Sequence, residues 1–270
     1  MTPVVTARVF LRCLRADLRR ALGGWLFWTV VGLIVVFQLL DMSEEYLISL
    51  RAGGSSAVYL FSSFAWNNAL LFMCLAMLPA ALSFCTDWEH QFIRSSMIRS
   101  GQPAYSWSKV AATAVSAFLA VFLANIVTAS LLASRLPALP AYAYEEGYNV
   151  YQPDAIGSLA MESPWIYYIA ESAVRALACM SWAVFALFIS TCMPNRLVVL
   201  AVPVIIFYAI TYFVLLPPIL TPTNLMNGTI GSLEDSPGRA IAYLIVLNTL
   251  MIAVWGILFS KNIRRRIAGD

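Results

Sequence analysis

Charged side chains are scarce in this sequence, and histidine and lysine are scarcer still. Of the 270 residues, 11% are charged, one is a histidine and two are lysines. Soluble domains carry about 25% charged residues, so this composition excludes an ordinary water-soluble domain. Hydrophobic residues make up 61% of the chain, and the mean hydropathy is +0.77. The chain therefore needs a lipid bilayer as its solvent.

Cysteine is also infrequent. Each of the five cysteines lies in the basic N-terminal segment or in an apolar run; they are Cys13, Cys74, Cys85, Cys179 and Cys192. None lies in a connection that we expect outside the cell. The sequence therefore predicts no disulfide framework.

Six long apolar runs divide the chain. A hydrocarbon core of about 30 Å needs about 20 apolar residues in a helix, and the runs approach or exceed that length. They predict membrane-spanning helices at about 25–42, 58–85, 110–133, 165–193, 197–216 and 240–260. We expect an all-α integral membrane protein with one domain over residues 1–270, in which Pro79 and Pro203 kink their spans.

Basic residues gather in every second connection between these runs. They precede the first run, join the second to the third and the fourth to the fifth, and follow the sixth. The positive-inside rule places these segments in the cytoplasm. It predicts a multi-pass protein of the inner (cytoplasmic) membrane with both termini in the cytoplasm. A cleaved signal peptide is disfavoured, because no small-residue cleavage site follows Leu40 and five more runs come after it.

The segment from 6 to 22 has the pattern of an amphipathic helix. One stripe holds Arg8, Arg12, Arg15 and Arg19, and another holds Phe10, Leu14, Leu18 and Leu22. This pattern predicts an elbow helix that lies on the inner leaflet. Such a helix serves as a topology signal and lipid anchor, and it can also touch a cytoplasmic partner.

A second amphipathic segment joins the second span to the third on the cytoplasmic side, between Asp87 and Lys109. Its apolar row consists of Phe92, Ile93, Met97 and Ile98, between Arg94 and Arg99. Gly101 and Pro103 are typical of a helix end. The pattern predicts a short helix from His90 to Ser100, parallel to the membrane. The alternative is an ordinary interfacial loop.

These features together resemble the permease subunits of ABC type-2 exporters. In that family an acidic residue at the inner end of the second span leads into a coupling helix, a Pro or Gly turn, and a lysine that opens the third span. Glu89, the helix from His90, the turn at Gly101 and Lys109 follow that order. The likeness extends to the elbow, the six spans and a Pro-rich outer connection over 216–239.

The resemblance implies a transport complex with its ATPase on another chain. The coupling residues would be Glu89, His90, Phe92, Ile93, Arg94, Met97 and Arg99. They would dock on a nucleotide-binding ATPase subunit that holds ATP and magnesium, and the chain would pair with a second permease copy or a related permease. A Walker A motif is impossible here, because neither Lys109 nor Lys261 lies in a Gly-rich loop. The chain itself would then hold no cofactor and be no enzyme.

One charged pair lies inside the predicted fourth span. Glu171 and Arg175 are four residues apart, which allows them to pair on one helix face. Either charge alone would cost about 2.5–3.5 kcal/mol at the bilayer centre. The pair either lines the substrate path or a subunit contact, or it is a self-neutralising pair buried between helices. Few other polar residues line the presumed path, so an amphipathic or hydrophobic cargo fits it best, such as a peptide, lipid or antibiotic.

Two other classes compete with a permease. An intramembrane enzyme needs clustered catalytic groups, but the only histidine, His90, lies at the inner surface beside Glu89. An ion-coupled secondary carrier needs polar groups near the bilayer midplane, and apart from Glu171 and Arg175 the spans offer only uncharged ones, such as Gln38 and Asn125. Both classes stay open as alternatives.

Overall fold

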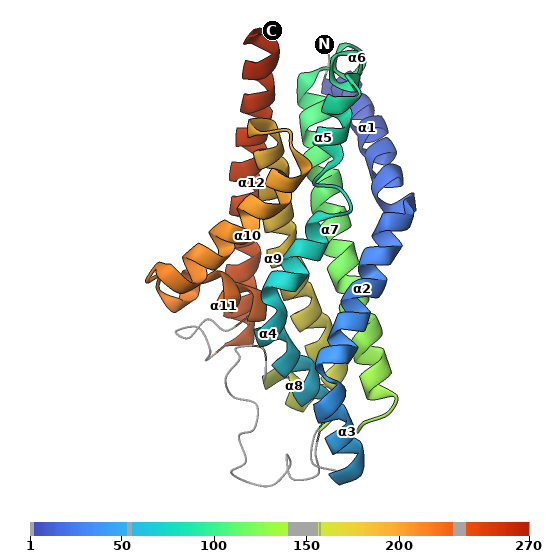
Figure 1. Ribbon diagram of the computed structural model, residues 1–270, viewed down its shortest axis with the longest axis vertical. Helices are drawn as coiled ribbons and strands as arrows, with labels where there is room; N and C mark the ends of the chain where they lie inside the picture. Colours follow the sequence, from blue (N-terminus) through green and yellow to red (C-terminus); the bar gives the residue numbers. More distant parts are fainter. Residues whose placement is uncertain (1–2, 53–55, 140–155, 157, 229–235, 270) are drawn as a thin grey trace.

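The computed structural model describes residues 3–52, 56–139, 156, 158–228 and 236–269. Within these ranges it contains helices and no strands. The helices form an elongated bundle (Figure 1). Both ends of the described chain lie at one end of the bundle, which we call the inner end because the basic N- and C-terminal segments lie there.

The helices follow one another through short connections. Their bounds are α1 Pro3–Gly23, α2 Trp25–Asp41, α3 Ser43–Ala52, α4 Ala57–Met77, α5 Ser83–Glu89, α6 Phe92–Ser100, α7 Gln102–Ala133, α8 Ser158–Glu162, α9 Pro164–Cys192, α10 Arg196–Phe213, η2 Pro218–Leu220, α11 Pro222–Asn227 and α12 Pro237–Gly269. Figure 1 places α6 at the inner end, and α3 and α8 at the opposite end.

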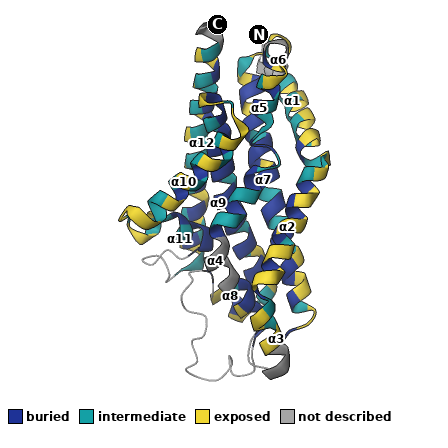
Figure 2. Ribbon diagram, in the orientation of Figure 1, coloured by how far each residue is buried: buried dark blue, intermediate teal, exposed yellow. Residues whose placement is uncertain are grey.

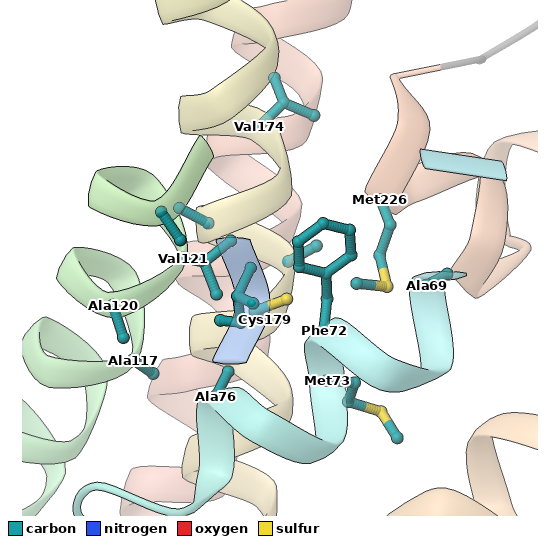
Figure 3. Packing of buried hydrophobic residues seen from close by; sticks show 14 of the residues in the cluster. Ala69, Phe72, Met73, Ala76, Ala117, Ala120, Val121, Val174, Cys179 and Met226 are labelled. Carbon is teal, nitrogen blue, oxygen red and sulfur yellow. The ribbon is translucent and has the colours of Figure 1, made fainter. Parts of the chain in front are cut away.

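Two long helices, α7 and α9, form the centre of the bundle. Both are rich in buried alanine and serine, and small side chains let helix backbones approach closely in a membrane. Ala117, Ala120 and Val121 of α7 are fully buried in a cluster that also contains Phe72 of α4 and Cys179 of α9 (Figure 3). The exposed residues lie mainly on the surrounding helices (Figure 2).

Several helices are suited to crossing a membrane. Among the described residues, α7, α9, α10 and α12 are long and apolar enough, and a fifth candidate arises if the bent pair α1 and α2 counts as one span. These helices support a multi-pass membrane protein. The 17 residues of α2 would span only about 25 Å, less than the hydrocarbon core. The six-span count therefore stays a prediction.

The predicted second span, 58–85, is wrong as a single helix. The structure has α4 and α5 there, with turns over 78–82. Pro79 lies in this break, where its ring removes a backbone donor from the helix. Pro203 behaves differently, since α10 continues through it.

The predicted elbow segment 6–22 is helical, within α1. It runs along α7, and α2 follows it after a bend of 52° (Figure 1). The arginine stripe is exposed as predicted. An elbow helix would lie across the bundle, whereas α1 packs along α7. An elbow that lies on the inner leaflet therefore stays a prediction.

A small polar contact joins α2 to the centre of α7. Gln38 donates to Asn125 Oδ1 at 2.6 Å and accepts a hydrogen bond from the hydroxyl of Thr128, and all three residues are buried. Mutual pairing removes much of the cost of burying these groups. Gln38 thus joins α2 to Asn125 and Thr128 of α7.

The structure describes parts of the two long outer connections and all five cysteines. The connection between α7 and α8 carries four tyrosines that lie outside the described residues: Tyr142, Tyr144, Tyr148 and Tyr151. The Pro-rich connection over 216–239 contains η2 and α11. All five cysteines are free in the structure.

Candidate functional site

The predicted coupling segment lies at the inner end as a capped helix. Helix α5 ends at Glu89, Gln91 adopts a left-handed conformation with φ of 56°, and α6 then begins at Phe92, two residues later than predicted. Gly101 ends α6 with φ of 78°, a value that favours glycine. Pro103 lies in the first turn of α7, where proline is favoured, so it starts a helix.

Helix α6 has one face in the bundle and one face outside it. Ile93 is buried and Met97 packs beside it, against a cluster that includes Phe84 and Phe259. On the other side Phe92 is 56% exposed and Ile98 is 86% exposed. In Figure 1 α6 is seen nearly along its own axis, so it lies across the end of the bundle.

The remaining predicted coupling residues surround α6. Arg99 is exposed in the last turn, and His90 is exposed just after α5. Glu89 forms an exposed ion pair with Arg196 at the start of α10. Arg94 belongs to α6, but its side chain lies outside the described part of the structure. The structure thus brings the described coupling residues to one end of the bundle.

A buried ionic cluster lies just beneath α6, and the sequence pattern did not predict it. The amine of Lys109 in α7 is 3.0 Å from Asp17 Oδ1 in α1 and 2.8 Å from Asp87 Oδ2 in α5. Arg20, whose side chain is 61% exposed, lies 3.1 Å from the other Asp87 oxygen at the edge of the buried group. We call these four residues the inner cluster. Two acids balance two bases, so the cluster as a whole is neutral.

Hydroxyl groups complete the inner cluster. Tyr105 donates to Asp87 Oδ2 at 3.1 Å, and Ser108 donates to Asp17 Oδ2 at 2.8 Å. The Lys109 side chain is only 3% exposed and that of Asp87 only 5%. Buried charges are tolerated when they are paired and hydrogen-bonded, and this arrangement meets both conditions.

The pKa of Asp87 reflects two opposing effects. Burial raises this pKa. The charges of Lys109 and Arg20 and the hydrogen bonds that both donate lower it by more than burial raises it, so the pKa of Asp87 falls below its ordinary value. The Asp87 carboxyl is therefore ionised at neutral pH, which is the state that pairs with Lys109.

One sequence signal could have pointed to the inner cluster. Asp17 is the only acid in α1, among five arginines. A single charge of opposite sign on such a helix indicates a partner elsewhere in the fold. The identity of that partner could not be deduced, because Lys109 lies 92 positions further along the chain.

Two cavities border the inner cluster. One, of about 260 Å³, lies among α1, the break after α4, and α7; the other, of about 400 Å³, lies among α1, α6 and α7. Asp17, Arg20 and Lys109 line both cavities. Charged residues of the inner cluster therefore line both cavities, and we take the cluster as the candidate polar site of the described residues.

The predicted pair in α9 also forms. Arg175 Nη2 lies 2.9 Å from Glu171 Oε1, which confirms the ion pair that the spacing predicts. We call it the outer pair. Arg175 also donates to the backbone carbonyl of Phe61 at 3.2 Å and lies 4.7 Å from the centre of its ring. Both charged side chains are 1% exposed, and Arg175 Nη1 finds no hydrogen-bond partner among the described residues.

The described residues offer no group of three or more His, Cys, Asp or Glu side chains that could hold a metal ion. Comparisons with known proteins find no match to the chain among protein-family models, curated proteins or solved structures. The function therefore has to be argued from the site itself.

Proposed function

We propose that the chain is the transmembrane permease subunit of an ATP-driven exporter of the ABC type-2 kind. The observation that carries the proposal is α6, a short helix that lies across the inner end and exposes Phe92, Ile98 and Arg99. Large apolar side chains at such exposure on a cytoplasmic tip favour a protein partner. A nucleotide-binding subunit is the partner that the resemblance implies.

The inner cluster supplies a route for coupling in this proposal. Movement of α6 would pass through the short connection at Gln91 to α5, whose Asp87 binds Lys109 of α7. Lys109 in turn binds Asp17 of α1. A displacement at the inner end would therefore reach α1 and the central helix α7 together, since packed and ion-paired elements move as units.

The rest of the proposal follows the resemblance. Six spans, with α1 as the elbow, would form half of a pathway that a second identical or related permease completes. ATP and magnesium would bind to the ATPase subunits. The outer pair would line the upper pathway or a subunit contact, and the cargo would be amphipathic or hydrophobic, such as a peptide, lipid or antibiotic.

The test is co-purification of ATPase activity with the chain from its native membrane. The chain has no Walker A motif, so any hydrolysis that purifies with it belongs to a partner. F92A/I98A removes the exposed apolar contacts of α6 and should lower the co-purifying ATPase activity at least tenfold. The matched control V127A/L131A removes two similarly large exposed side chains from the far part of α7 and should leave it unchanged.

Two results would count against the permease. One is a natively purified chain that brings no ATPase with it. The other is an equal loss of ATPase activity in F92A/I98A and in V127A/L131A, because the loss would then not arise at α6.

The inner cluster favours a second candidate, an ion-coupled secondary carrier. Buried acids and bases within a bundle are typical of proton and ion relays, and Asp17 and Asp87 share one buried amine. In this case purified chain alone, reconstituted in vesicles, would move cargo under an imposed proton gradient without ATP. The permease proposal expects no such transport.

A further inference from the structure

The larger of the two cavities beside the inner cluster has walls from several helices. It measures about 400 Å³ and lies among α1, α6 and α7, and pockets of this size hold small molecules. Its wall includes Ala16 of α1 and Phe92 of α6. Phe92 is 56% exposed and the side chain of Arg20 is 61% exposed. The cavity is therefore open to the surface at the inner end.

The carboxylates beside this cavity already have their donors. Asp17 receives Lys109 at Oδ1, 3.0 Å away, and the hydroxyl of Ser108 at Oδ2, 2.8 Å away. Asp87 receives Arg20 at Oδ1 and Lys109 at Oδ2. Each of the four carboxylate oxygens thus has a donor, so the acids do not need a further cation.

Donors on the same wall are still available. An ammonium group has three N–H donors, and Lys109 has two carboxylate partners among the described residues. Arg20 uses only Nη1 for its bond to Asp87, and Arg99 makes no hydrogen bond or ion pair with a described residue. The Lys109 side chain is 3% exposed, and a buried charged donor requires an acceptor. Its third N–H therefore needs a partner from one of the cavities that Lys109 lines.

The charges around the cavity favour an anion. Two acids and three bases line it: Asp17, Asp87, Arg20, Arg99 and Lys109. The formal charge of this wall is therefore positive. The three bases come from α1, α6 and α7, so an anion that reaches all of them needs several acceptor oxygens. A phosphate group has three or more, whereas a carboxylate has two, and the planar guanidinium matches phosphate well.

The cavity lies on the aqueous side of the membrane surface. The α1 residues that line it fall between Cys13 and Arg20. Helix α2 begins after them at Trp25, which is 78% exposed, and Trp28 is 61% exposed. Exposed tryptophans are typical of the headgroup level of a membrane. A ligand of this cavity therefore enters from the water at the inner end.

From these observations we infer that the cavity among α1, α6 and α7 binds a small water-soluble phosphate monoester. Lys109, Arg20 and Arg99 donate to the phosphate oxygens, and the organic part lies beside Ala16 and Phe92. The inference does not rest on the permease proposal, because the chain alone is expected to bind the ligand without an ATPase.

Equilibrium dialysis of the purified full chain tests the site. The chain is held in an uncharged detergent at constant ionic strength, and the probe is radiolabelled inorganic phosphate. Wild type should bind the probe saturably. R99Q should weaken this binding about tenfold, because a hydrogen bond to a charged group contributes enough free energy for that factor. Unlabelled phenyl phosphate should displace the probe, whereas benzoate at the same concentration should not.

Matched variants make the result specific. R264Q removes an exposed arginine from α12 at the same end of the bundle and should leave the affinity unchanged. R99K keeps the charge and should retain most of the binding. A16W adds a large side chain to the cavity wall without changing its charge, and it should abolish binding.

A second measurement uses two cysteines of the chain. Cys13 lines the cavity, whereas Cys192 is exposed at the end of α9 and is not part of the wall. With phosphate at about ten times its Kd, only about a tenth of the chains have an empty cavity. Alkylation of Cys13 by N-ethylmaleimide should then slow about tenfold by the same mass action, and alkylation of Cys192 should not change. Mass spectrometry of the peptides measures both rates.

Four results would overturn the inference. Absence of saturable binding would mean that water alone satisfies the third N–H of Lys109. Equal losses in R99Q and R264Q would show that only diffuse charge matters. Equal displacement by benzoate and phenyl phosphate would rule out selection of phosphate. Displacement by phosphatidic acid in the detergent, but not by phenyl phosphate, would assign the site to a lipid headgroup.

Discussion

The inner cluster and the outer pair are both neutral, yet they are built differently: both charges of the outer pair are buried, whereas Arg20 of the inner cluster is largely exposed. The outer pair joins two residues one turn apart on α9, and the backbone of Phe61 caps it. The inner cluster joins three helices that lie far apart in the sequence, and two cavities border it. One arrangement neutralises a single helix, while the other ties helices together.

The two sites should therefore respond differently to substitution. Replacing both residues of the outer pair leaves no unpaired charge. Replacing any residue of the inner cluster removes a contact between helices, because its ion pairs join α1, α5 and α7. Breaking a buried ion pair costs about 3–5 kcal/mol when one charge is left unpaired, but replacing the whole pair can be neutral. The following experiments use that contrast.

The largest effect is expected from K109M. The substitution leaves Asp17 and Asp87 buried side by side without their shared amine, so the free energy of unfolding should fall by about 5 kcal/mol. Denaturant titration of the purified chain in detergent measures the loss. K261M alters the only other lysine, which is exposed, and should change stability little. Similar losses in both variants would contradict the importance of the inner cluster.

A somewhat smaller effect is expected at the outer pair. R175M leaves one carboxylate unpaired and should cost about 3 kcal/mol of unfolding free energy. E171Q/R175M removes both charges and should recover most of that loss, within about 1 kcal/mol of wild type. The same titration in detergent measures both variants. If the double variant is as unstable as R175M, then the pair is not self-contained.

The smallest effect concerns pH and Asp87. The lowered pKa of Asp87 means that its stabilising contribution is complete above the ordinary aspartate value of about 3.9 and is lost as pH falls through the lower folded-state value. D87N should therefore be less stable than wild type at pH 6 by about 1.5–3 kcal/mol. The difference should shrink as pH falls below 4. Thermal unfolding of wild type and D87N between pH 3 and pH 6 measures this difference in stability. A difference that does not change with pH would contradict the stabilising role of ionised Asp87.

Local features of the fold could be predicted from the sequence. Gly101 was correctly expected to end α6, because an interruption of the apolar row and a glycine coincide there. The ion pair of Glu171 and Arg175 was also correct, since a helix places residues four apart on one face. The start of α6 was two residues off, because the left-handed conformation at Gln91 leaves no clear mark in the residue pattern.

Features that depend on distant residues could not be predicted. The sequence pattern did not show that Asp87 pairs with Lys109 while Glu89 pairs with Arg196. A difference of two residues turns a helical side chain to the other side of its helix, and apolar spacing does not show which side faces α7. The break at Pro79 was expected as a kink within one span, yet the chain starts a separate helix there.

The sequence by itself determined the solvent and the class of fold. Its low charge and long apolar runs require a bilayer and helices, because the backbone of a spanning segment must satisfy its own hydrogen bonds there. The packing of the helices determines which of them lie at the centre and that Asp17, Asp87 and Lys109 meet. Such contacts depend on how helices pack across the whole chain, which a local pattern of residues does not encode.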